Sequence, residues 1–132
     1  MKKYFRYIFL PLLVVLVIFV GTCLLSSNDV PNMPANIAWD KLAHFGMFFV
    51  LSGVSLFFYY KLHNGKPKMS RCIFWGFIVP VIYGGVIELL QKYVFTSRSA
   101  EWGDFVANVL GALFGCVVVV IYFRILRKST SR

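Results

Sequence analysis

Residues 88–108, ELLQKYVFTSRSAEWGDFVAN, join two strongly apolar segments and contain three of the chain's five acidic residues. The flanking segments, 72–90 and 105–123, are each long enough to cross most of a bilayer as a helix, at ~1.5 Å per residue. Glu88 lies within the first segment and Asn108 within the second, where hydrocarbon solvates polar groups poorly. This stretch therefore predicts a hairpin of two membrane helices that carries a functional polar site.

Apolar runs of this kind account for the composition of the whole chain. Of its 132 residues, 59% are hydrophobic and 14% are charged, and the mean hydropathy is +0.74. Long uncharged runs are typical of membrane helices, and none of these runs alternates with the period of two that a barrel strand requires. We predict an all-α membrane protein, a bundle of four transmembrane helices forming one domain over 1–132, with helices at about 5–25, 41–61, 72–95 and 104–124.

The basic residues are divided unequally between the expected loops. If the amino terminus is cytoplasmic, eleven of the 14 lysines and arginines lie on the inner side, and only Lys41, Lys92 and Arg98 lie on the outer side. This asymmetry predicts cytoplasmic termini in a bacterial cytoplasmic (inner) membrane. All five acidic residues fall on the outer half, so we expect the polar site to face the extracytoplasmic side. The net charge of +9 follows the same asymmetry and does not indicate binding to nucleic acid.

The first apolar run permits a second interpretation. Lys2, Lys3 and Arg6 precede a run that ends in Val-Gly-Thr-Cys23, a pattern similar to a secretory signal or a lipoprotein signal cleaved before Cys23. Thr22 is poorly suited to that cleavage position, and the run is long enough to span a membrane. We expect an uncleaved first helix.

The second helix is expected to begin with three polar residues on one side. Asp40 and His44 are four residues apart, and Lys41 and His44 are three apart, so their side chains project from a common face. Asp40 is placed to cap the helix N-terminus, where a carboxylate suits the helix dipole. Taken alone, this group is equally consistent with a cap and a histidine that is hydrogen-bonded between helices.

The third apolar run carries a stripe of one small and two polar residues. Gly84, Glu88 and Gln91 are spaced i, i+4 and i+7, which places them on one face of a helix. Glu88 should lie about 9 Å below the outer end of the helix, where a carboxylate is neutral or paired. We favour a functional role for it over a purely structural hydrogen bond. Pro80 predicts a kink in this helix.

The fourth run has a polar top and a small-residue face below it. Asp104, Asn108, Gly111 and Gly115 are spaced i, i+4, i+7 and i+11, so the polar pair should point toward neighbouring helices. Asp104 is a candidate N-cap. In the connection before it, Arg98 is the one arginine on the outer side, able to pair with a carboxylate or to grip a phosphate, whereas we expect Glu101 to be solvated.

Together these motifs resemble the VanZ-like family of bacterial membrane proteins. The resemblance covers the second to fourth helices and lies in three blocks in order: Asp40-Lys41-x-x-His44-Phe45, Glu88-x-x-Gln91, and Arg98 followed by Asp104-x-x-x-Asn108-x-x-Gly111-Ala112-x-x-Gly115. It implies a small multi-spanning protein of the cell envelope. The family takes its name from a member associated with resistance to the glycopeptide teicoplanin, so antibiotic resistance is one function that the resemblance implies.

These residues predict a site that binds or modifies an outer-leaflet ligand: a lipid headgroup, a lipid-linked wall precursor or a lipoglycopeptide antibiotic. In an enzyme, His44 and Glu88 would share acid–base work, with Asp104 holding the histidine. The candidate ligand-binding residues are Asp40, Lys41, Gln91, Arg98 and Asn108. Whether the site is catalytic stays open at this level, and so does oligomerisation.

Two further expectations limit this hypothesis. A metal held by His44, Glu88 and Asp104 is chemically allowed, but a single histidine is a weak indication, so we expect no metal and no other cofactor. The alternative function is a non-catalytic scaffold, in which the polar cluster is hydrogen-bonding glue between helices. A transporter is disfavoured because the sequence shows no inverted repeat and no polar path to the inner side.

Overall fold

The computed structural model describes residues 2–25, 38–95 and 100–131, and over these ranges every regular element is a helix. Four helices are long and apolar enough to cross a membrane: Tyr4–Leu24, Trp39–Leu62, Met69–Tyr93 and Trp102–Thr130. The predicted all-α fold with four spanning helices is therefore confirmed. The elements are α1 (Lys2–Phe19), η1 (Val20–Leu24), α2 (Trp39–Leu62), α3 (Met69–Ile73), η3 (Phe74–Ile78), α4 (Val79–Tyr93) and α5 (Trp102–Thr130), where η marks a π-helical turn.

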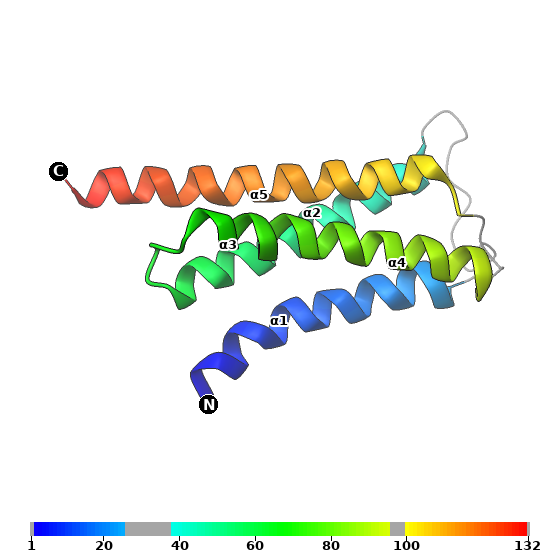
Figure 1. Ribbon diagram of the computed structural model, residues 1–132, viewed down its shortest axis with the longest axis horizontal. Coiled ribbons are helices and arrows are strands. Elements are labelled where there is room, and N and C mark those ends of the chain that lie inside the picture. The colour runs from blue at the N-terminus through cyan, green and yellow to red at the C-terminus, as the bar shows by residue number, and fades with distance from the viewer. Residues whose placement is uncertain (1, 26–37, 96–99, 132) are drawn as a thin grey trace.

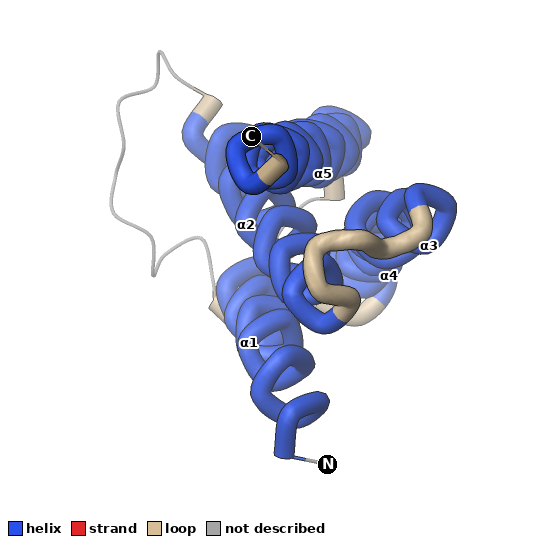
Figure 2. Tube along the Cα trace, turned by 90° about the vertical axis from the view of Figure 1, so that its left-hand side faces the viewer, coloured by secondary structure: helices blue, strands red, loops and turns tan. Residues whose placement is uncertain are grey.

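The four spans run up and down, so that their ends and the segments that join them lie at two opposite ends of the bundle (Figure 1). Both termini and the turn between α2 and α3 lie at one end, and the start of α2, the end of α4 and the start of α5 lie at the other. Viewed along the bundle, α2 lies between α1 and α5 (Figure 2). Because α2 also contacts η3 and α4, its residues meet all the other spans.

The most extensive contact between two described helices is between α2 and α5, and two glycines of α5 lie in it. A Cβ atom added at Gly111 would collide with the carbonyl oxygen of Phe45, and one added at Gly115 would lie 2.5 Å from the carbonyl oxygen of Phe49. The predicted Gly111-x-x-x-Gly115 face thus lets two helix backbones touch. This contact fixes which side of α5 faces α2, and with it the direction of Asp104 and Asn108.

The third span contains a π-helical turn, η3, which lies just before Pro80. The kink predicted at Pro80 stays a prediction. Pro80 has no amide hydrogen to donate to the carbonyl of Gly76, four residues earlier. The Ser52 hydroxyl of α2 donates to that Gly76 carbonyl and also lies 2.8 Å from the carbonyl oxygen of Ala112. A side chain of α2 thus donates to a backbone carbonyl that lacks its usual i+4 donor because of the proline.

The helix starts differ from the prediction in detail. Ala38 and Glu101 are the N-cap residues of α2 and α5, so the prediction that Asp40 and Asp104 are N-caps is wrong. Each helix begins instead at a tryptophan, Trp39 or Trp102, which places the carboxylate inside the first turn. A carboxylate there still benefits from the helix dipole, and its side chain is free to point between helices.

Candidate functional site

Three spans contribute to one hydrogen-bonded chain of polar side chains. His44 of α2 has its Nδ1 atom 3.0 Å from Asn108 Oδ1 of α5, and Asn108 Nδ2 donates to Glu88 Oε1 of α4 at 3.3 Å. His44 Nδ1 is also 3.8 Å from Glu88 Oε1. The predicted convergence of these three residues is therefore confirmed. His44 and Asn108 are fully buried within the protein, and the side chain of Glu88 is 12% exposed.

Three charged residues, Lys41, Glu101 and Asp104, lie next to this chain of polar side chains, toward the end of the bundle. Lys41 Nζ lies 2.9 Å from Glu101 Oε2 and 3.8 Å from Asp104 Oδ1. The Lys41 and Glu101 side chains are each about half exposed, whereas Asp104 is buried. The hydrogen bond from Lys41 holds the pKa of Glu101 below its ordinary value. Gly103 of α5 leaves room for the Lys41 side chain, because a Cβ atom added at this glycine would collide with it.

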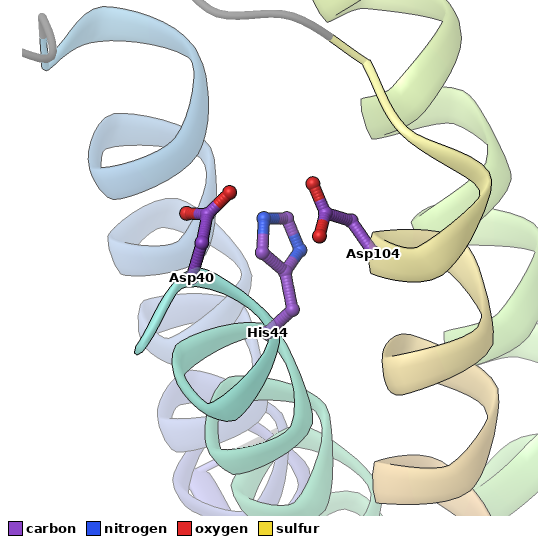
Figure 3. A group of neighbouring side chains, drawn as sticks. All are labelled: Asp40, His44 and Asp104. Atoms are coloured by element: carbon purple, nitrogen blue, oxygen red, sulfur yellow. The ribbon is translucent and has the colours of Figure 1, made fainter. Parts of the chain in front are cut away.

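Asp40, His44 and Asp104 form a second group that shares the histidine (Figure 3). One ligand atom from each residue lies within 4.8 Å of the others. Figure 3 shows the imidazole of His44 between the two carboxylates, with Asp40 on the same helix and Asp104 facing it from α5. Because Nδ1 is bonded to Asn108, the second ring nitrogen is the one left to act as an acid, base or ligand.

Among the described residues, three carboxylate or amide oxygens of this region are buried without a hydrogen-bond partner. They are Glu88 Oε2, Gln91 Oε1 and Asp104 Oδ1. Burying an unpaired polar atom costs about 1–3 kcal/mol. Most buried polar groups in folded proteins are paired, so a cluster of three exceptions is typical of a site that receives a ligand, ion or water.

Gln91 lies at the edge of the cluster and contacts helix one. Its side-chain amide donates to the carbonyl of Thr22 at 2.9 Å, and that carbonyl belongs to the π-helical turn η1. Tyr83 makes a similar contact, since its hydroxyl donates to the carbonyl of Val15 at 2.8 Å. The ligand-binding role predicted for Gln91 stays a prediction, and the observed contact is with the backbone of helix one.

A groove between α4 and α5 adjoins the polar cluster. It has a volume of about 610 Å³ and is lined mainly by apolar side chains. Glu88 and Glu101 lie in its wall together with Lys92, so its polar end is the cluster itself. The other lining residues are Ile82, Gly85, Val86, Leu89, Ala100, Trp102 and Phe105. A groove of this shape suits a ligand that has both an apolar chain and a polar head.

The structure brings together most of the residues that the sequence predicted. The cluster contains Asp40, Lys41, His44, Glu88, Asp104 and Asn108, whereas Arg98 lies outside the described residues. The expectation that Glu101 is solvated missed its ion pair with Lys41. Glu101 and Asp104 are three residues apart, and this spacing could have placed both on the side facing Lys41.

Comparisons of this chain with protein-family models, with curated proteins and with solved structures find no match. The resemblance to the VanZ-like family therefore rests on the sequence blocks alone, and the site is interpreted from its own geometry.

Proposed function

We propose that the chain is a VanZ-like protein of the bacterial cytoplasmic membrane that binds the polar head of an outer-leaflet amphiphile in its polar cluster. The candidate ligands are a membrane lipid, a lipid-linked wall precursor and a lipoglycopeptide such as teicoplanin. All three join a polar head to an apolar chain. The polar cluster would receive the head, and the groove between α4 and α5 would receive the chain.

One observation carries this proposal: the buried polar chain and the apolar groove share Glu88. Its Oε1 atom accepts a hydrogen bond from Asn108, its Oε2 atom has no hydrogen-bond partner among the described residues, and its side chain lies in the groove wall. Hydrogen bonding between helices alone does not account for a carboxylate oxygen left in this way beside a groove on the face of the bundle. A ligand head that donates a hydrogen bond would satisfy it.

The distribution of charge supports an orientation for the site. The basic turn and the termini lie at one end of the bundle, and the cluster lies at the other (Figure 1). Under the positive-inside rule, the basic end is cytoplasmic and the cluster faces the extracytoplasmic side. An outer-leaflet ligand could then enter the groove sideways from the bilayer.

The enzyme form of this proposal uses the same residues. A head bound beside Glu88 would lie near His44, whose ring is held by Asn108 at one nitrogen and flanked by Asp104. His44 and Glu88 would then exchange a proton with the bound head, while Asp104 stabilises the charged imidazole. Lys41 would contact an anionic group at the entrance.

The test fills the groove without changing the cluster. A Cβ at Gly85 would meet only Phe105, at 3.7 Å, so Gly85→Leu extends into the groove with little cost to packing. We expect the full chain, purified in detergent, to retain about tenfold less amphiphile than the unchanged protein, as measured by native mass spectrometry. Gly46→Leu adds the same side chain on α2 where nothing lies within 4 Å, and it should retain the normal amount. Equal retention by both variants would contradict the proposal.

The scaffold remains the second candidate function, because the bonds of the cluster already link α2, α4 and α5. On that account the cluster exists only to hold the bundle together for assembly with other membrane proteins. It predicts that substitutions in the cluster reduce stability, and that filling the groove has no effect on bound amphiphile.

A further inference from the structure

The entrance of the polar cluster is rich in carboxylates. Those of Asp40, Glu101 and Asp104 lie around Lys41, and Glu101 accepts a hydrogen bond from that lysine at 2.9 Å. A phosphate on a ligand would enter among these acidic groups. A divalent cation bound there would supply an attraction for the anion.

Asp40, His44 and Asp104 provide a donor set for such a cation. Their ligand atoms lie within 4.8 Å of one another, and they come from adjacent turns of α2 and from the facing turn of α5. Donor atoms around one metal with bonds of about 2.1 Å lie at most ~4.2 Å apart. A small rotation of the exposed Asp40 side chain would close the difference.

An independent observation concerns Asp104. This residue is 1% exposed, yet in the part of the chain that the structure describes its Oδ1 atom has no hydrogen-bond partner and makes only a long ion pair with Lys41 Nζ, at 3.8 Å. Figure 3 shows the Asp104 carboxylate directed toward His44. A buried carboxylate oxygen without a hydrogen bond destabilises the fold unless a cation is bound beside it.

The contacts of His44 also match those of a metal ligand. Its Nδ1 atom lies 3.0 Å from Asn108 Oδ1, which can only accept, so Nδ1 is the donor in this bond, and in the neutral imidazole the lone pair is then on Nε2. Asn108 is held in turn by Glu88. A histidine that binds a metal through one ring nitrogen usually donates from the other to such a neighbour, which fixes the ring.

We infer that Asp40, His44 and Asp104 bind a divalent transition-metal cation, Mn²⁺ or Zn²⁺, whose open coordination positions accept a phosphate oxygen. One imidazole with two carboxylates suits these ions. The sequence-based metal set paired His44 and Asp104 with Glu88, and the geometry replaces Glu88 with Asp40. The role for phosphate rests on the proposed function, because it names the chemistry of the ligand head.

The first test measures Mn²⁺ binding to the full chain, purified in detergent and treated with EDTA. Electron paramagnetic resonance should show saturable binding of one Mn²⁺ per chain, with spin-echo modulation from one imidazole nitrogen. Asp40→Asn should weaken Mn²⁺ binding at least about tenfold. The control, Glu101→Gln, removes an equal charge from a residue outside the donor set and should weaken binding less than about threefold. Equal weakening by both, or bound Mn²⁺ without a nitrogen ligand, would overturn the inference. The nitrogen signal is read from the unchanged protein, so it decides even if a variant misfolds.

The second test separates this inference from the proposed function. Metal-loaded and EDTA-treated protein are mixed with phosphatidylglycerol or phosphatidylcholine vesicles, with and without inorganic phosphate as a competitor. We expect metal-dependent binding that inorganic phosphate reduces. Headgroup binding that is equal with and without metal would overturn the metal's role and leave the proposed function intact. Stoichiometric Mn²⁺ binding without any headgroup binding would support the metal site and contradict the proposed function.

Discussion

Asn108 Oδ1 lies 3.0 Å from His44 Nδ1, and the amide nitrogen of the same asparagine donates to Glu88. One asparagine on α5 thus links α2 and α4 at the buried end of the cluster. Because an amide offers both an acceptor and a donor, it can bridge a histidine and a carboxylate that lie too far apart, at 3.8 Å, to bond directly.

Removing this bridge should destabilise the bundle. Asn108→Ala leaves a buried imidazole nitrogen and a carboxylate oxygen without their partner, and we expect the free energy of unfolding to fall by about 1–3 kcal/mol. Thermal unfolding of the purified protein, followed by circular dichroism, measures the change. Val106→Ala, at a position on α5 that is 53% exposed, is the matched control and should change stability by less than ~1 kcal/mol. Equal losses in the two variants would show that the bridge adds nothing.

The α2–α5 contact should not tolerate a single added methyl group. Gly111→Ala places a Cβ against the Phe45 carbonyl, and a backbone atom cannot move aside as a side chain can. We expect a loss of about 1–3 kcal/mol from overpacking, measured in the same unfolding assay. Gly46→Ala adds the same methyl group to α2 in open space and should be neutral or slightly stabilising. A neutral Gly111→Ala would refute the close backbone contact.

Ser52 and Pro80 should be coupled energetically although they do not bond to each other. Ser52→Ala removes the donor to the Gly76 carbonyl, at a cost of about 1–3 kcal/mol. Pro80→Ala returns an amide hydrogen to α4, so the same serine substitution should cost less in that background. A double-mutant cycle should give a coupling of at least ~0.5 kcal/mol. Strict additivity would mean that Ser52 does not compensate for the proline.

The Lys41–Glu101 ion pair should make stability depend on pH in the acidic range. The pKa of Glu101 is lowered in the folded protein, so the pair stabilises the fold above the ordinary glutamate pKa of about 4.3. This contribution is lost as the pH falls through the lowered value. From about pH 6 to about pH 3, the melting temperature of the unchanged protein should therefore fall more than that of Glu101→Gln. Both side chains are half exposed, so the difference should be small and should shrink in salt.

The spans and their polar faces could be predicted because hydrophobic run length and helical spacing determine them directly. The i, i+4, i+7 and i+11 spacing of Asp104, Asn108, Gly111 and Gly115 was enough to place the polar pair between helices, where both are now seen to be buried. The helix ends were harder to predict. Trp39 and Trp102 start their helices without a side-chain cap, so the carboxylates at Asp40 and Asp104 gave misleading signals for the cap positions.

Contacts between helices could not be predicted from the spacing within each helix. The pairing of Lys41 with Glu101 depends on how α2 and α5 are placed relative to each other. From sequence alone, a charged residue in a connection between helices is expected to be solvated. The same limit applies to the metal donors. Only the packed structure groups Asp40, instead of Glu88, with His44 and Asp104 as possible metal donors.

The central claim is that the cluster receives a ligand and does not serve only to hold the helices together. Glu88→Gln tests it most directly, because the glutamine oxygen can still accept the hydrogen bond from Asn108 at the Oε1 position. Amphiphile retained by the purified full chain is measured by native mass spectrometry, beside its melting temperature. We predict that retention falls about tenfold while the melting temperature changes by less than about 4 °C. Normal retention in a protein of normal stability would contradict the claim and leave the cluster as interhelical hydrogen bonding.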